Sequence, residues 1–199
     1  MPDAGPSSSR SVYVRSLTTR PPESEIDRPV QLGSAFFVSD SADLANGLRA
    51  LLLLVAANGG PWLAARLLGE RWAAPVDLGL TLADGRRLLG AHKTWRGLAV
   101  GVLTTALVGY LTGLPWSVGA GVAALALLGD LLSSACKRRL GHAPGRVVPL
   151  IDQLPEAVLP LVVLARPLAL NTTLIAAVVV VFSLLNLAST LFRERTSTV

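Results

Sequence analysis

The stretch GVAALALLGDLLSSACKRRLG, residues 121–141, decides the fold, because it joins an apolar run to a group of polar and cationic side chains. After the apolar half come Asp130, two serines and three consecutive cations. A helix needs about 20 apolar residues to cross a hydrocarbon core about 30 Å thick. The stretch therefore predicts a membrane-spanning helix whose polar end reaches the membrane surface.

The composition of the whole chain agrees with a membrane protein. Of its 199 residues, 51% are hydrophobic and 16% are charged, whereas soluble domains carry roughly 25% charged residues. Apolar runs fill most of the chain after residue 43, so we expect one integral membrane domain over residues 44–199. Residues 1–43 are rich in Ser, Pro and Arg and predict a disordered or surface tail without a cleavable signal peptide.

Two classes of protein are disfavoured by the charge pattern and the cysteine count. The net charge of +5 resides in short connections between apolar runs, which argues against a nucleic-acid-binding face. Cys136 is the only cysteine, so the chain can form neither an intrachain disulfide nor a multi-cysteine metal site.

Five apolar stretches predict an all-α, polytopic helical bundle of about five transmembrane helices. Asn58, two glycines and Pro61 interrupt the first stretch and predict a kink there. Small residues recur in the second and third stretches, which favours close contact between helix backbones. The predicted spans are residues 46–68, 98–114, 115–132, 157–170 and 171–192.

The positions of Lys and Arg predict the orientation of the bundle. They concentrate in residues 69–97 and in the loop after the third span, while the hairpin between the second and third spans has none. Both cationic loops should therefore face the cytoplasm. With five spans, the N-terminus lies outside and the C-terminus inside.

The polar end of the third span carries the first candidate site. On a continuing helix, Asp130, Ser133 or Ser134, and Lys137 fall on one face. An aspartate so near the membrane needs a local cationic partner. Asp130 and Lys137 are about 10 Å apart along the axis, too far to pair directly. We therefore expect a hydrated metal ion bound to a polyphosphate between them.

A pair of carboxylates opens the fourth span. Asp152 and Glu156 are four residues apart, so a helix places them on the same side. Two adjacent carboxylates favour a bound cation, and hard oxygen ligands favour Mg²⁺. The alternative is that both acids stabilise a helix N-terminus.

The first cationic loop contains an ADG turn signature and then the polar residues His92, Lys93, Thr94 and Arg96 around Trp95. One interpretation is an interfacial anchor, with the tryptophan at the headgroup level. The other is a phosphate-binding surface. Carboxylates for a metal and cations for phosphate, both on one side of the membrane, indicate phosphoryl or nucleotidyl transfer.

Two motifs carry a resemblance to a known family. GDLLSSACKRRLG followed by PLIDQL, together with LGLTLADGRRLLGAHKTWRG, resembles the CDP-archaeol synthase family of membrane cytidylyltransferases, over about residues 46–192. The resemblance implies that CTP and a lipid phosphate give a CDP-lipid and pyrophosphate, with Mg²⁺. It implies the following roles: catalysis by Asp130, Lys137 and Asp152; metal binding by Asp130, Asp152 and Glu156; substrate binding by Lys93, Thr94, Arg96, Ser133, Ser134, Arg138 and Arg139.

One position departs from the family pattern. The family usually has a second acid three residues after the first acid of its second motif, where this chain has Pro155 followed by Glu156. Proline is acceptable in the first helical turn, and Glu156 could supply the carboxylate instead. The departure could also mean altered metal affinity, another substrate or lost activity.

The sequence leaves the lipid open among a phosphatidate-like lipid, an archaeal ether lipid and a polyprenyl phosphate, because apolar pockets discriminate weakly. It also permits a homodimer and predicts no nucleic-acid partner. The alternative functions are a small transporter or lipid translocator and an inactive family member. A transporter usually has ionisable groups near mid-membrane and an inverted repeat, whereas here the charges lie at one face and no repeat is visible.

Overall fold

A computed structural model describes residues 41–142 and 148–196 of the protein. The predicted tail, apart from its last three residues, and the segment 143–147 lie outside the described residues. The described part is all-helical apart from two isolated β-bridges, which confirms the predicted class. The helices are α1 (Ser41–Leu68), α2 (Trp95–Leu111), α3 (Trp116–Arg139), α4 (Pro149–Val163) and α5 (Thr172–Thr196).

Three of the described helices, α1, α3 and α5, are long and apolar enough to cross a membrane. Helix α2 is apolar but has only 17 residues, and α4 has 15. Helix α3 continues past its apolar part to Arg139, as the column of polar residues required. The interruption at Pro61 lies inside α1, which is helical on both sides of it.

The predicted start of the fourth span was wrong. Helix α4 begins at Pro149, eight residues before the predicted start at Ala157, and ends at Val163. Arg166 and Pro167 lie in the turn that follows the helix. A hydropathy pattern detects the apolar part of a helix, and the first two turns of α4 are polar on one side. Proline at the first helical position fits this start, because the N–H that it lacks would have no partner within the helix.

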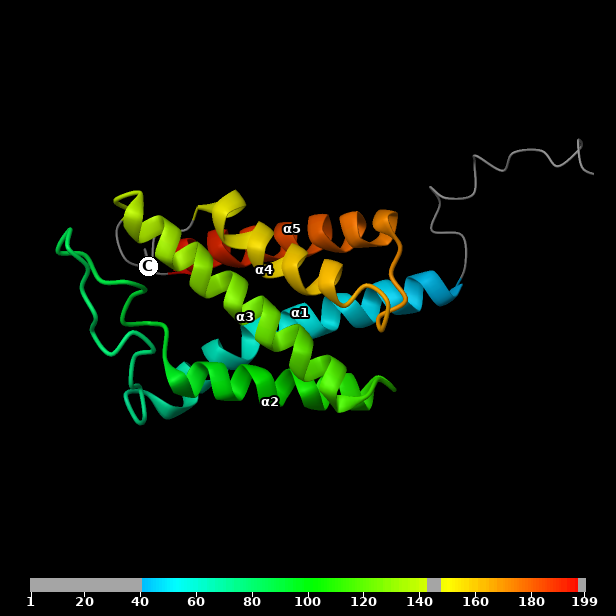
Figure 1. Ribbon diagram of the computed structural model, residues 1–199. Coiled ribbons are helices and arrows are strands. Elements are labelled where there is room, and N and C mark those ends of the chain that lie inside the picture. The colour runs from blue at the N-terminus through cyan, green and yellow to red at the C-terminus, as the bar shows by residue number, and fades with distance from the viewer. Residues whose placement is uncertain (1–40, 143–147, 197–199) are drawn as a thin grey trace, which may run out of the picture. The chain divides into compact units, whose positions relative to one another are not determined.

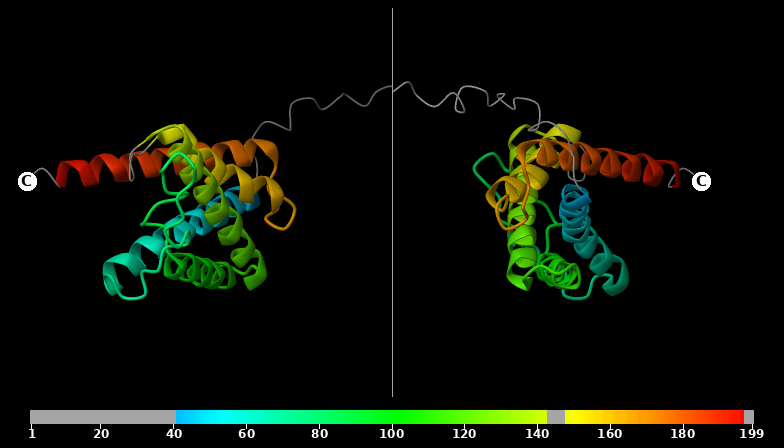
Figure 2. Two further views of the ribbon diagram at one scale, coloured as in Figure 1. Left: turned by 60° about the vertical axis from the view of Figure 1, so that its left-hand side comes forward. Right: turned by 90° about the vertical axis from the view of Figure 1, so that its right-hand side faces the viewer.

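Helices that follow one another in the chain pack side by side: α1 on α2, α2 on α3, and α3 on α4. Helix α3 lies between α2 and α4, and α5 contacts both α1 and α4 (Figure 2). The loop 69–94, the end of α3 and the start of α4 gather at one end of the helices, and the α2–α3 and α4–α5 turns lie at the other (Figure 1). We call the first the loop end. It holds the first cationic loop together with the three consecutive cations at the end of α3, which the sequence predicted to lie on one side (Figure 1).

Glycines set the distances between these helices. A Cβ atom added to Gly119 in α3 would lie 2.5 Å from the carbonyl oxygen of Thr105 in α2. One added to Gly60 in α1 would lie 3.1 Å from Cα of Gly101 in α2. Water supplies no driving force between helices in a bilayer, so association depends on such backbone contact. The predicted role of small residues is confirmed here.

The tightest of these contacts joins α3 to α4. A Cβ atom on Gly129 would collide with the carbonyl oxygen of Pro155 and would lie 2.5 Å from its carbonyl carbon and 2.8 Å from the amide nitrogen of Glu156. The backbones of the two helices therefore touch at this point. Because Asp130 follows Gly129 directly, the contact brings Asp130 and Glu156 to the same level of the bundle.

We predict that Gly129→Ala destabilises the protein by about 1–3 kcal/mol, because the added methyl group must push α4 away from α3. Thermal unfolding in detergent measures the effect. Gly59→Ala is the matched control, since no atom outside its own helix lies within 4 Å of its added Cβ. Equal melting temperatures for the Gly129→Ala variant and the control would show that the helices are not in contact here.

Candidate active site

The loop 69–94 is organised around the carboxylate of Asp77. Its Oδ1 accepts hydrogen bonds from Nη2 of Arg87 at 2.6 Å and from the backbone N–H of Gly79 at 3.1 Å. Its Oδ2 accepts from the backbone N–H groups of Leu89 and Gly90 at 3.2 and 3.3 Å. One buried side chain thus holds together the two halves of the loop.

The pKa of Asp77 records the balance of these contacts. Burial raises it, since only 7% of the residue is exposed, but the hydrogen bonds from Arg87 and the three backbone N–H groups lower it more. The net result is a pKa lowered from 3.8 to about 2. The carboxylate therefore stays ionised, and the loop is held by a charge-assisted network.

The ADG signature forms the predicted turn and fastens the loop to α3. Gly85 has a positive φ of 72°, and the backbone N–H of Arg86 donates to Asp84. A β-bridge joins Thr81 and Arg87 on either side of the turn. Asp84 then pairs with Arg139 of α3 at 2.7 Å. The turn thus lies against the loop end of α3.

The end of the loop descends between the helices before α2 begins. An antiparallel bridge joins Pro75 to Thr94, and the hydroxyl of Thr94 caps α2 by accepting from the backbone N–H of Gly97 at 3.1 Å. A Cβ on Gly97 would lie 3.3 Å from Cβ of Pro61, which is seven residues before the end of α1. Gly97, in the first turn of α2, therefore lies about 10 Å below the end of α1.

The descending segment places Lys93 against α3. Its Nζ lies 2.7 Å from Oδ1 and 2.5 Å from Oδ2 of Asp130. Asp130 is nine residues before the last residue of α3, about 14 Å below the end of that helix. A carboxylate at this depth needs a cation, and the first loop provides it. The pair joins the first loop to α3, the helix whose polar end the sequence singled out.

A second ion pair joins α3 to α4. Nζ of Lys137 lies 2.5 Å from Oδ1 of Asp152. The other oxygen of Asp152 accepts from the backbone N–H of Val148, the N-cap of α4, at 3.0 Å. Asp130 and Lys137 do not pair with each other, as expected, but each has a direct partner in another segment, so neither needs an ion between them. The metal-bound polyphosphate stays a prediction. The N-terminal role considered for Asp152 is confirmed.

Glu156 lies between the two ion pairs. It is 5% exposed, and Lys93, Asp130, Lys137 and Asp152 are all close enough to interact with it electrostatically. Its Oε1 is buried and accepts no hydrogen bond from any described residue. Three acidic side chains share two ammonium groups, and each ammonium group has an aspartate as its ion-pair partner, so Glu156 is the acid of this cluster that belongs to neither ion pair.

The donor chemistry of this cluster suits a divalent cation, because Mg²⁺ prefers carboxylate oxygens and Glu156 offers one without a partner. As arranged, however, no three acidic, histidine or cysteine side chains in the described ranges are close enough to hold an ion. The two lysines occupy the aspartate oxygens that an ion would need. Magnesium binding by this cluster therefore stays a prediction.

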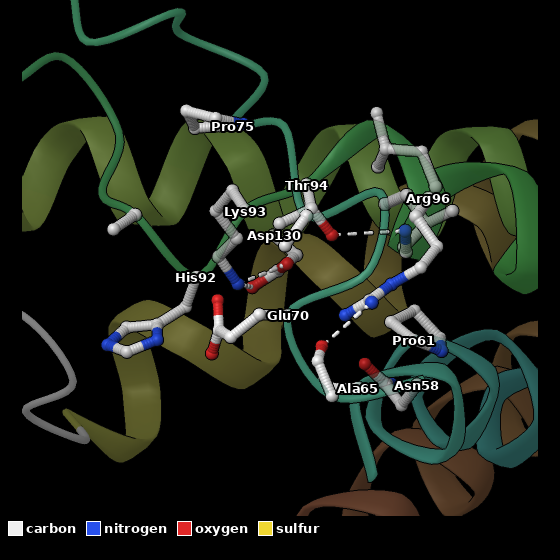
Figure 3. A pocket seen from close by; sticks show the side chains of 16 residues that line it. Asn58, Pro61, Ala65, Glu70, Pro75, His92, Lys93, Thr94, Arg96 and Asp130 are labelled. Carbon is white, nitrogen blue, oxygen red and sulfur yellow. Dashed lines mark hydrogen bonds and ion pairs between the residues drawn. The ribbon is translucent and has the colours of Figure 1, made fainter. Parts of the chain in front are cut away.

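A pocket of about 540 Å³ opens beside the Lys93–Asp130 pair (Figure 3). Four predicted residues, His92, Lys93, Thr94 and Arg96, line it with Asp130. It also includes Asn58 and Glu70, which sequence reasoning missed as site residues. Asn58 was interpreted only as part of a kink, although a polar amide within an apolar span was a signal that could have revealed it.

Several predicted substrate-binding residues have structural partners. Arg96 donates to the backbone carbonyl groups of Gly69 and Arg71 and so holds the chain beyond α1. The hydroxyl of Ser133 donates to the carbonyl of Asp130 in its own helix. Ser134, Lys137 and Arg138 are buried in the packing of α3. Their roles toward a substrate remain predictions.

A second pocket, of about 350 Å³, lies on the other side of His92 and is rich in cationic groups. It shares Ala91 and His92 with the first pocket. Its remaining lining residues are Arg86, Arg87, Gly90, Arg138 and His142.

The sequence matches the family model described as CarS-like CDP-archaeol synthase. The matches cover residues 48–125 and 117–194, which include every residue of both ion pairs and Glu156. The chain belongs to this family. The match to the CDP-archaeol synthase family covers nearly all of the described residues and confirms the resemblance predicted from the sequence.

Individual members of the family align over shorter lengths. The CDP-archaeol synthase of Thermofilum pendens is 41% identical over 133 residues, which are 63% of this chain and 65% of that protein. That of Pyrobaculum arsenaticum is 46% identical over 103 residues, 49% of this chain and 61% of that protein. That of Methanopyrus kandleri is 40% identical over 131 residues, which are 63% of this chain and 70% of that protein. This family member thus spans less than two thirds of the length of the first two relatives.

A solved structure shares the fold of this family member. It is described as an intramembrane enzyme for archaeal membrane lipids biosynthesis, and it matches with a TM-score of 0.61 and 33% identity over 72% of this chain and 92% of that chain. Together with the three long apolar helices, the match identifies this chain as an integral membrane protein.

The low pKa of Asp77 predicts how the loop of this CDP-archaeol synthase family member responds to acid. The pKa of Asp77 is lower in the folded than in the unfolded state, so ionised Asp77 stabilises the folded protein fully above pH 3.8. This stabilisation, about 2 kcal/mol in total, is lost as the pH falls toward 2. Amide hydrogen exchange of Gly79, Leu89 and Gly90, corrected for intrinsic rates, should therefore accelerate between pH 4 and about 2.

The Asp77→Asn variant controls for general acid effects. Its loop should exchange faster at pH 6 and should lack the additional acceleration in acid. Protection that is as strong at about pH 2 as at pH 6 in the unmodified protein would show that Asp77 does not hold the loop.

Proposed function

We propose that the protein transfers CMP from CTP to a lipid phosphate and forms a CDP-lipid and pyrophosphate. The observation that carries this proposal is the convergence of Lys93–Asp130, Lys137–Asp152 and Glu156 below the loop end of a membrane bundle. Membership of the CDP-archaeol synthase family supports it. Because the relatives are named for CDP-archaeol, an ether-linked isoprenoid lipid phosphate is the first lipid to test.

The reaction needs few proton transfers from the protein. An oxygen of the ionised lipid phosphate attacks the α-phosphorus of CTP, a new P–O bond forms, and the bond to the β-phosphate breaks and releases pyrophosphate. No proton must leave the attacking group near neutral pH, so His92 is a contact for the nucleotide and not a general base. Catalysis then consists of positioning and charge neutralisation.

The two lysines perform the neutralisation. In the observed arrangement, each ammonium group pairs with an aspartate. The phosphates of CTP compete for the same ammonium groups, and their arrival frees oxygens of Asp130 and Asp152 beside Glu156. These three carboxylates would hold Mg²⁺, which when bound withdraws negative charge from the triphosphate. Arg138 and Arg139 lie close by on α3 and contribute positive charge.

A transporter or translocator is not favoured by these observations. The described ionisable cluster lies toward one end of the bundle, and all five of its residues fall within the match to the CDP-archaeol synthase family model. The orientation with this end in the cytoplasm also belongs to the proposal, because CTP is a cytoplasmic metabolite. A homodimer remains a prediction, which the mass of the detergent-solubilised protein tests directly.

The first test of the function supplies the purified protein with labelled CTP, Mg²⁺ and three lipid phosphates: an isoprenoid ether lipid phosphate, phosphatidate and a polyprenyl phosphate. We expect a CDP-lipid from at least one. Substitutions Lys93→Met, Asp130→Asn, Lys137→Met and Asp152→Asn should each lower kcat/KM at least about 100-fold, the scale seen when one transition-state contact is removed.

Arg49→Gln is the control for the loss of a cation, because Arg49 donates to Asn46 near the opposite end of α1. It should retain full activity. Folded protein that yields no CDP-lipid from any of the three lipids would refute the proposed function.

The Glu156→Gln variant tests the metal assignment. Removing this carboxyl group should raise the Mg²⁺ concentration for half-maximal activity about 10-fold or more, because carboxylate ligands supply most of the attraction for the ion. Electron paramagnetic resonance of bound Mn²⁺ gives a second readout. Asp43→Asn, in the first turn of α1, is the control. An unchanged metal requirement would exclude Glu156 as a ligand.

A further inference from the structure

The pocket beside Lys93 has a floor that differs from its mouth. Near the loop end it is lined by Glu70, Ala73, Pro75 and His92. The floor is formed by the lining residues farthest from the loop end, which are Asn58 of α1, Leu98 of α2 and Leu127 of α3. Asn58 is thus the polar group of an otherwise apolar floor.

Asn58 lies deep relative to the end of its helix. Ten residues separate it from Leu68, the last residue of α1, which corresponds to about 15 Å of helix. Asp130 lies at a similar depth, about 14 Å below the end of α3. The floor of the pocket is therefore level with the ion pair but belongs to the apolar part of the bundle.

The side chain of Asn58 retains free hydrogen-bonding capacity. Its Nδ2 donates one hydrogen bond to the carbonyl of Leu54 in the same helix, at 3.3 Å. An amide group can donate two hydrogen bonds and accept more. The second N–H and the Oδ1 have no partner among the described residues. Burial of a polar group without hydrogen-bond partners costs free energy. A bound ligand that hydrogen-bonds to Asn58 would remove this cost.

Pro61 and the contact of α1 with α2 surround the position of Asn58. Pro61 lacks an N–H, so the carbonyl of Ala57 has no partner from that position. On the side facing α2, Gly60 and Gly101 bring the two helices together, and a Cβ on Gly101 would lie 3.2 Å from the carbonyl oxygen of Ala57. Asn58 projects into the pocket between this contact and α3, with Pro61 next to it (Figure 3).

Building on the proposed cytidylyltransferase function, we propose that Asn58 binds the lipid phosphate substrate and not CTP. CTP enters from water, meets the loop residues at the mouth of the pocket and reaches Lys93 with its phosphates. The lipid enters from the bilayer, and the junction between its phosphate and its hydrocarbon chains requires a surface that is apolar with one hydrogen-bonding group. The floor formed by Asn58, Leu98 and Leu127 has this character. A neutral amide donates to a phosphate or glycerol oxygen without adding a charge at this depth.

The test measures binding of each substrate separately from turnover. Stabilisation of the detergent-solubilised protein against heat gives the affinity for phosphatidate or an isoprenoid ether lipid phosphate, and equilibrium dialysis with Mg²⁺ gives the Kd for CTP. Asn58→Ala should weaken lipid phosphate binding at least about 10-fold and leave the Kd for CTP within about 2-fold. Asn58→Asp should weaken it further, because a carboxylate repels the phosphate.

Asn46→Ala is the matched control, since Asn46 belongs to the same helix but donates to the carbonyl of Ala169 near the opposite end of the bundle. It should leave both affinities unchanged. Retained CTP binding in the Asn58 variants demonstrates that they are folded.

Two results would overturn the assignment: weaker CTP binding with unchanged lipid binding, or no change in either affinity. The readout is independent of the proposed reaction. An unmodified protein that binds lipid phosphate through Asn58 but forms no CDP-lipid would refute the proposed function and leave this inference intact.

Discussion

The ion pair between Lys93 and Asp130 is the interaction on which the rest of the site depends. A carboxylate about 14 Å below the end of a membrane helix is expensive without a counter-charge. That charge comes from a loop that must leave α1, turn back and descend to reach it. The order around Asp77, the bridge between Pro75 and Thr94 and the low start of α2 all serve this descent.

The second constraint is the contact between Gly129 and the backbone of Pro155 and Glu156. It places two acids from different helices at one level and buries the Glu156 side chain between two lysines. Proline at position 155 is compatible with this arrangement, because the contact uses its carbonyl group and needs no side-chain hydrogen bond. The departure from the family pattern therefore leaves a carboxylate in the cluster, one position later.

The sequence was sufficient to predict the helical membrane bundle, the meeting of the two cationic loops at one end and the residues of both ion pairs. Apolar length, Lys and Arg positions and helical spacing carry that information. The pairing itself could not be predicted, because spacing along one helix cannot show that Lys93 crosses to Asp130 and Lys137 to Asp152. The start of α4 was missed because its first turns are polar, and Asp77 was missed because only the folded loop brings its partners together. Asn58 was missed although a polar amide within an apolar span was a visible signal.

The network around Asp77 has a consequence for the speed and strength of ligand capture. Four hydrogen bonds fix a segment that otherwise would have to be ordered by the ligand itself. The conformational entropy of the loop is thus lost when the protein folds, not when a nucleotide arrives. Capture then resembles docking onto a preformed loop, and the ligand uses none of its binding free energy for ordering this segment.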